Sequence, residues 1–106
     1  MNNKFDVITM YPQLQVGLDA IQCEMGISLD DIRSKTQLNE VVMARVILCA
    51  LFPSAKIRVL SLLINHHNST VSYYRKLFGE MMQFDPLFKG LYERVFNRYN
   101  KLSNVE

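Results

Sequence analysis

The sequence predicts an all-α domain, and three observations support this fold class. The chain has 106 residues, which suffices for one compact core and leaves little room for a second domain. Prolines and small polar residues divide it into segments whose apolar residues recur every three or four positions. No segment shows the sustained apolar–polar alternation of a strand. We therefore expect about six helices in a single domain, residues 1–106.

The first three predicted helices cover residues 12–25, 28–33 and 40–52. Pro12 suits the first turn of a helix, and Gly26 is typical of a helix end. Ser28 and Asp31 form a Ser-x-x-Asp capping pattern for the short second helix. The third helix is apolar on nearly every side, which predicts that it is the central and most buried element.

The last three predicted helices cover about residues 54–64, 68–82 and 86–102. Pro53 ends the central helix, and Ser54 can cap the next one. A polar turn then leads to the fifth helix, which Asn68 or Ser69 can cap. Asp85, followed by a proline, is a strong start signal for the sixth. The sixth helix should bury Phe88, Leu91, Tyr92, Val95, Phe96 and Tyr99.

Several classes of protein do not fit the sequence. No apolar run reaches the roughly 20 residues that a membrane span needs, and the N-terminus lacks the pattern of a signal peptide. We therefore expect a cytoplasmic protein with no membrane partner. No phosphate-binding loop is present, so we expect no nucleotide and no other cofactor. Cys23 and Cys49 both lie in apolar helical patterns, which favours buried free thiols. His66 and His67 have no third metal ligand at suitable spacing.

The charge is unevenly distributed along the chain. The formal net charge is only +2. Residues 1–52 carry four Lys and Arg against six Asp and Glu, a net charge of −2. Residues 53–106 carry eight against four, a net charge of +4. A basic half of this kind favours contact with phosphates, although an ordinary solvated surface explains it equally well.

Residues 54–82 have the layout of a helix-turn-helix. A short helix, a polar turn and a longer helix that starts with small hydrogen-bonding residues form a unit that can place its second helix in the DNA major groove. Asn68 and His67 can read base edges, and Lys56 and Arg58 can contact the flanking backbone. The alternative is that the two helices only pack together and that Asn68 and Ser69 only cap the second helix.

Several segments resemble the C-terminal DNA-binding domain of DnaA, the bacterial chromosomal replication initiator. Residues 26–35 are similar to the family's Val/Ile-Ser-Val-Asp-Asp-Leu-Leu-Ser-Lys segment, and residues 44–51 to its helix that begins Arg-Gln-x-Ala-Met-x-Leu. Residues 68–71 stand where the family has Asp-His-Thr-Thr-Val, and residues 85–88 resemble Asp-x-x-Phe. The resemblance covers about residues 12–95 and implies a Trp-repressor-like helical fold that binds double-stranded DNA.

The resemblance also implies which residues contact DNA. By position, His67 replaces the family's Asp, Asn68 its His and Ser69 its first Thr, whereas Thr70 is retained. Arg45 matches one of two arginines of a basic loop. The candidates for base contacts are His67, Asn68, Ser69 and Ser72, and those for phosphate contacts are Arg45, Lys56, Arg58, Thr70, Tyr73, Arg75 and Lys76.

Two departures from the family concern affinity and activity. The second arginine of the basic loop falls on Met43, and residues 36–40 carry no basic side chain. We expect weaker or differently targeted DNA binding as a result. The sequence has no counterpart of the family's ATPase domain, so we expect a stand-alone module of the bacterial cytoplasm or nucleoid. Its context would be replication control, transcription control or a mobile element.

Two other functions stay open at this stage. A protein-interaction module that kept the fold and lost DNA binding would fit the non-basic loop, the acidic first half and the six methionines. An enzyme fits less well, because no Ser/His/Asp, Cys/His or paired-carboxylate arrangement occurs at catalytic spacing. We therefore expect a protein that is not an enzyme.

Overall fold

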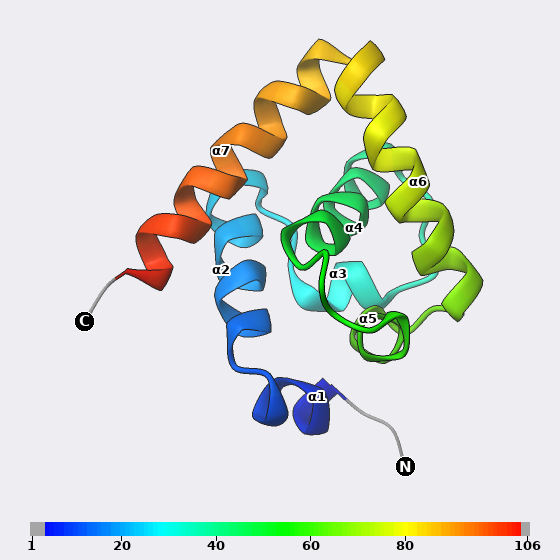
Figure 1. Ribbon diagram of the computed structural model, residues 1–106, viewed down its shortest axis with the longest axis vertical. Coiled ribbons are helices and arrows are strands. Elements are labelled where there is room, and N and C mark those ends of the chain that lie inside the picture. Colours follow the sequence, from blue (N-terminus) through cyan, green and yellow to red (C-terminus); the bar gives the residue numbers. More distant parts are fainter. Residues whose placement is uncertain (1–3, 105–106) are drawn as a thin grey trace.

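The structure, a computed structural model, describes residues 4–104 and is helical throughout its regular elements (Figure 1). Seven helices occur in that range: α1 (Lys4–Met10), α2 (Gln13–Met25), α3 (Leu29–Arg33), α4 (Asn39–Leu51), α5 (Ile57–Ile64), α6 (Asn68–Phe84) and α7 (Pro86–Ser103). The predicted all-α class is confirmed. None of these helices is both long and apolar enough to cross a bilayer.

Helix α1 is the one element that the sequence did not predict. Its stretch Val7-Ile8-Thr9 is β-branched, which lowers intrinsic helix propensity. The helix packs against α5 and α2, and Val7 is buried there. Contacts with α5 and α2 therefore stabilise α1 as a helix, although its β-branched residues disfavour one.

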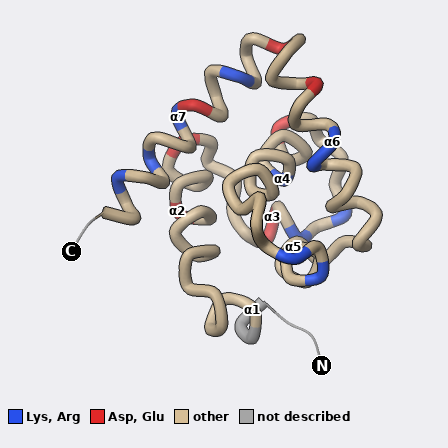
Figure 2. The backbone as a smooth tube through the Cα atoms, viewed as in Figure 1, with Lys and Arg blue, Asp and Glu red and all other residues tan. Residues whose placement is uncertain are grey.

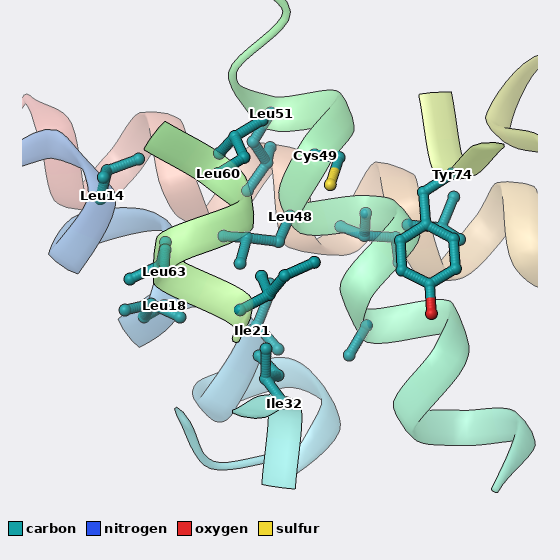
Figure 3. Close-up of a cluster of buried hydrophobic side chains, with 14 of the residues drawn as sticks. Leu14, Leu18, Ile21, Ile32, Leu48, Cys49, Leu51, Leu60, Leu63 and Tyr74 are labelled. Carbon is teal, nitrogen blue, oxygen red and sulfur yellow. The ribbon is translucent and has the colours of Figure 1, made fainter. Parts of the chain in front are cut away.

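Helix α4 is the centre of the fold, as its composition predicts. Every residue from Ala44 to Cys49 is fully buried. The surrounding helices contribute the rest of the core, including Ile21 of α2, Ile32 of α3, Leu60 of α5 and Tyr74 of α6 (Figure 3). The part of α4 from Ala44 to Cys49 has no exposed side, which explains why this part of the sequence lacks a polar stripe.

The helix ends match the sequence signals in part. Gly26 ends α2 in the left-handed region, with φ of 70°, and Ser28 and Asp31 form the predicted capping box of α3. Asp85 caps α7 by accepting a hydrogen bond from the Phe88 N–H at 3.1 Å. Two predicted caps are wrong. Helix α5 begins after Lys56 rather than at Ser54, and α6 begins after His67 with no side-chain cap.

Helices α6 and α7 diverge from a corner at residues 84–86 (Figure 1). Helix α6 descends beside α4 and α5, whereas α7 lies along α2. The ring of Phe78 on α6 packs edge-on against Phe88 and Tyr92 of α7 near the corner. Phe96 of α7 is 41% exposed, so the prediction that it is buried is wrong.

The two cysteines have different environments. Cys49 lies in the core of α4, where burial raises its thiol pKa to about 12, although Arg75 opposes the shift. Cys23 is exposed on α2, which corrects the prediction that both thiols are buried. Cys23 stands two residues after the buried Ile21, which places it on the solvent side of α2.

Candidate nucleic-acid interface

A tight turn joins α5 to α6 and positions the start of α6. Asn65 ends α5 with a left-handed φ of 61°, a conformation that asparagine adopts more readily than most residues. Its side-chain amide donates to the Arg33 carbonyl at 3.3 Å. The His66 N–H donates to the Ser61 carbonyl at 3.1 Å. The turn is thus held by both α5 and the end of α3.

All four candidates for base contacts are exposed at this end of α6. His67 and Asn68 lie at its start, and Ser69 and Ser72 follow on its solvent face. No acidic residue lies in the first turn. No side chain caps the helix, and the Thr70 N–H donates to the His67 carbonyl at 3.0 Å, so the Asn68 and Ser69 N–H groups are the ones open to a ligand acceptor. The structure therefore brings the predicted base-reading residues together.

Two candidates for phosphate contacts continue the same face. Tyr73 and Lys76 are exposed and stand four and seven residues after Ser69, which is the spacing of one helical stripe. The opposite stripe, with Val71 and Tyr74, is buried. Thr70, between the two stripes, is half-buried.

Arg45 cannot serve as the predicted phosphate contact, and this prediction is corrected. Its side chain is fully buried. The guanidinium donates to the backbone carbonyls of Ile32 at 2.9 Å, Thr36 at 2.8 Å and Ser34 at 2.7 Å, with a longer contact of 3.4 Å to the Asp31 carbonyl. Arg45 therefore organises the segment between α3 and α4, and it has no free surface for a ligand.

Arg75 is also directed inward, so its predicted phosphate role is corrected too. Its Nη2 donates to the carbonyls of Phe52 at 3.1 Å and Ala55 at 2.6 Å. Its Nε is buried without a hydrogen-bond partner. Arg75 thus ties α6 to the turn between α4 and α5.

The remaining candidates for phosphate contacts lie at the start of α5. Lys56 and Arg58 are both exposed. Lys56 lines a separate hollow of about 270 Å³ with Tyr11 and Leu14, beside the start of α2. Lys56 therefore lies apart from the hollows at the start of α6.

The segment between α3 and α4 contributes site residues that the sequence did not indicate. Lys35 lines a hollow of about 290 Å³ together with His66 and His67. Gln37 lines a second hollow, of about 470 Å³, together with Ser69 and Tyr73. Lys35 directly precedes residues 36–40, the loop that carries no basic side chain. Only the packing of α3 against α5 brings this segment to the turn.

His66 separates the two hollows and lines both of them. One ring nitrogen lies 3.2 Å from the Ser34 carbonyl, which also accepts from Arg45. Burial lowers the pKa of His66, and the nearby charge of Arg45 lowers it further, against the opposing hydrogen bond to Ser34. The ring is thus disposed to be neutral and to join the turn to the 34–38 segment.

No group of three potential metal ligands occurs among the described residues. No family model matches the chain, and neither a curated protein nor a solved structure matches it. The resemblance to the DnaA domain therefore stays a prediction from the sequence.

Proposed function

We propose that this protein binds double-stranded DNA sequence-specifically, with the first half of α6 in the major groove, and that it is not an enzyme. One observation carries the proposal: the start of α6 presents an exposed polar face that is free of acidic side chains and lies beside a second segment with Lys35 and Gln37. A helix that enters the groove contacts bases with its first residues, which is the end that is exposed here.

The proposed contacts follow from side-chain chemistry. Asn68 can pair with adenine through two hydrogen bonds, and His67, Ser69 and Ser72 can each donate or accept one. Lys76 and Tyr73, further along the same stripe, can contact a phosphate. Lys35 can contact the backbone on the other side of the turn, because it shares a hollow with His67.

The inward positions of Arg45 and Arg75 lower the DNA affinity that we expect. Two of the seven candidates for phosphate contacts are used inside the protein instead. Each phosphate neutralised contributes about −0.9 to the slope of log affinity against log salt. We therefore expect a shallow salt dependence and modest affinity, with Lys35 supplying part of the missing charge.

The resemblance to the DnaA domain supports a role in replication control, transcription control or a mobile element, within the bacterial cytoplasm or nucleoid.

Selection from random duplexes, followed by fluorescence anisotropy on the enriched sequence, tests the proposal. Replacing Asn68→Ala together with Lys76→Ala should lower affinity at least about tenfold, through the loss of a bidentate base contact and a phosphate contact. The Lys76→Ala variant alone should reduce the salt slope by about 1.

The matched control is Asn100→Ala with Lys89→Ala, which removes the same two residue types from exposed positions on α7. The control should bind like the parent. Equal affinity of the α6 variant and the control would contradict the proposed face. Recovery of no enriched motif would contradict sequence-specific binding.

A protein partner on the same face is the second candidate function. Leu38 is 64% exposed and Tyr73 57% exposed, and Gln37, next to Leu38, lines the larger hollow with Tyr73. Exposed apolar side chains beside a hollow are typical of protein-binding surfaces. Absence of DNA binding at low salt would favour this candidate.

A further inference from the structure

A second basic surface lies on α7 and has no part in the proposed interface. Asn97 and Arg98 stand three and four residues after Arg94, and Lys101 stands four and three residues after them, so the four residues form one stripe of the helix. The Arg94 side chain is 61% exposed and that of Arg98 42% exposed. Together with Glu24 of α2, the four residues line a shallow hollow of about 190 Å³. We call these four residues the α7 stripe.

The α7 stripe and the start of α6 lie on different sides of the molecule. The basic positions in the second half of α7 lie on the side of the molecule that α2 occupies, whereas those of α5 lie on the other side (Figure 2). Helix α6 alone rises about 24 Å from its start to the corner, at about 1.5 Å per residue, before α7 begins to descend along α2. The α7 stripe and the start of α6 are therefore two separate surfaces of the molecule.

Glu24 orients the α7 stripe without neutralising it. Its carboxylate is 18% exposed and lies 3.0 Å from Arg98 Nε and 3.7 Å from Arg94 Nε. One carboxylate serves two guanidiniums here, and each guanidinium has five N–H donors. With Lys101, the stripe keeps a formal charge of +2. A clamp between α2 and α7 needs Arg98 alone, so it does not account for Arg94 and Lys101.

The chemistry of the stripe matches a phosphate backbone. Arg94 and Lys101 are separated by about 10 Å along the helix, which corresponds to about three base-pair steps of roughly 3.4 Å each. Guanidiniums that are held in place match phosphate oxygens with paired N–H groups. The hollow is lined by charged and amide side chains and lacks the aromatic anchor that usually dominates a protein interface.

We propose that the α7 stripe binds the phosphate backbone of a second DNA duplex, so that one molecule joins two DNA segments. The inference rests on the proposed function for the duplex at α6 and adds a sequence-independent contact at α7. The α6 face selects a site, and the α7 stripe holds another segment through charge alone.

Co-capture of two duplexes tests the proposal. Beads carry a biotinylated duplex with the sequence selected on the protein, and a fluorescent duplex of unrelated sequence is offered in solution. The Arg94→Gln, Lys101→Gln variant (the α7 variant) keeps the Arg98–Glu24 pair. Each lost phosphate contact should lower capture about eightfold at 0.1 M salt, so this variant should lose capture roughly 60-fold in all. Lys89→Gln, at an exposed position of α7 outside the stripe, should capture like the parent. The charge-preserving variant Arg94→Lys, Lys101→Arg should also retain capture.

A mixing experiment separates two faces on one molecule from a protein dimer. The α6 variant (Asn68→Ala, Lys76→Ala) and the α7 variant should each fail to join duplexes, and their mixture should fail as well. Recovery of capture in the mixture would overturn the proposal, because it would mean that two protein molecules supply one duplex each. Unchanged capture by the α7 variant would also overturn it.

Anisotropy with the selected duplex alone distinguishes failure of this inference from failure of the proposed function. If both hold, the α7 variant binds the selected duplex like the parent and the α6 variant does not. If the α6 variant retains binding and the α7 variant loses it, the proposed function fails and the stripe stands. If the α7 variant loses binding to anionic vesicles while its DNA capture is unchanged, the stripe binds a membrane surface and the proposal is overturned.

Discussion

The region around α4 and the start of α6 use the same kinds of residues in opposite ways. Arg45 is fully buried and its guanidinium holds the 32–36 backbone, whereas Lys76 is exposed and stands on an open polar face. Ser28 caps α3, whereas Ser69 and Ser72 point to solvent. The comparison teaches that the buried guanidinium of Arg45 stabilises the interior through hydrogen bonds to the backbone, whereas the polar side chains on the α6 face have no hydrogen-bond partner among the described residues.

Removing Arg45 should produce the largest effect on stability. Arg45→Ala leaves a cavity and removes the donors to the buried carbonyl of Ile32 and the part-buried carbonyls of Thr36 and Ser34, so we expect a loss of about 3–5 kcal/mol in the free energy of unfolding. Urea denaturation followed by circular dichroism measures it. Arg58→Ala, at an exposed position, should change stability by less than about 0.5 kcal/mol. Similar losses for the two variants would erase the contrast between the regions.

Gly→Ala should lower the free energy of unfolding beside the end of α4 and raise it on the exposed side of α6. A Cβ on Gly17 would lie 2.7 Å from Cε2 of Phe52, whose ring packs edge-on against Tyr99. Gly17→Ala should therefore cost about 1–3 kcal/mol, and Phe52→Leu should relieve part of that cost. A Cβ on Gly79 of α6 meets no atom within 4 Å. Gly79→Ala should stabilise by about 0.5–1 kcal/mol through helix propensity. Thermal denaturation of both variants checks the signs.

Replacing Ser28 or Ser72 tests the same comparison, with effects of about 1 kcal/mol or less on the free energy of unfolding. Ser28 accepts from the Asp31 N–H at 3.1 Å while its own N–H donates to the Asp31 carboxylate at 3.2 Å. Ser28→Ala should cost about 1 kcal/mol and loosen the backbone that surrounds Arg45. Ser72→Ala should leave stability within about 0.5 kcal/mol, because its side chain is exposed. Denaturant midpoints for the two variants give the result, and a cost at Ser72 would show that the α6 face has a structural role.

His66 lies where the two regions meet, and it should give the smallest effect. Its folded pKa lies below the ordinary value of 6.5, so the folded state disfavours the protonated ring. The associated stability is full above about pH 6.5 and is lost as the pH falls from there through the folded pKa. His66→Gln should flatten the dependence of stability on pH in that window, and urea denaturation at several pH values measures it. An unchanged pH dependence in His66→Gln would mean that the ring does not link the turn to the 34–38 segment.

The sequence predicted most of the helices because their signals are local. Proline, glycine and the Ser28–Asp31 pattern act within one turn of the residue they affect. Helix α1 could not be predicted in this way, because contacts with distant α5 and α2 override its β-branched composition. The same limit applies to the caps at Ser54 and Asn68, where the helices begin two or three residues away or without a side-chain cap.

The candidate site could be predicted only where exposure follows helical spacing. His67, Asn68, Ser69 and Ser72 lie off the apolar stripe of α6, and all four are exposed. Arg45 gave no such indication, because a basic residue in an apolar helix can either reach the surface or bind backbone carbonyls. The choice depends on the path of residues 31–36, which encloses its guanidinium.

The different environments of the two cysteines make this protein suited to single-site labelling. At neutral pH the Cys49 thiol is enclosed and, with a pKa near 12, protonated, whereas Cys23 is open to solvent. A maleimide dye should therefore attach at one position in the native chain, with no cysteine replaced. That position adjoins Glu24, beside the α7 stripe and away from the start of α6. An environment-sensitive dye on Cys23 would distinguish the arrival of a ligand at α7 from binding at α6 within one titration.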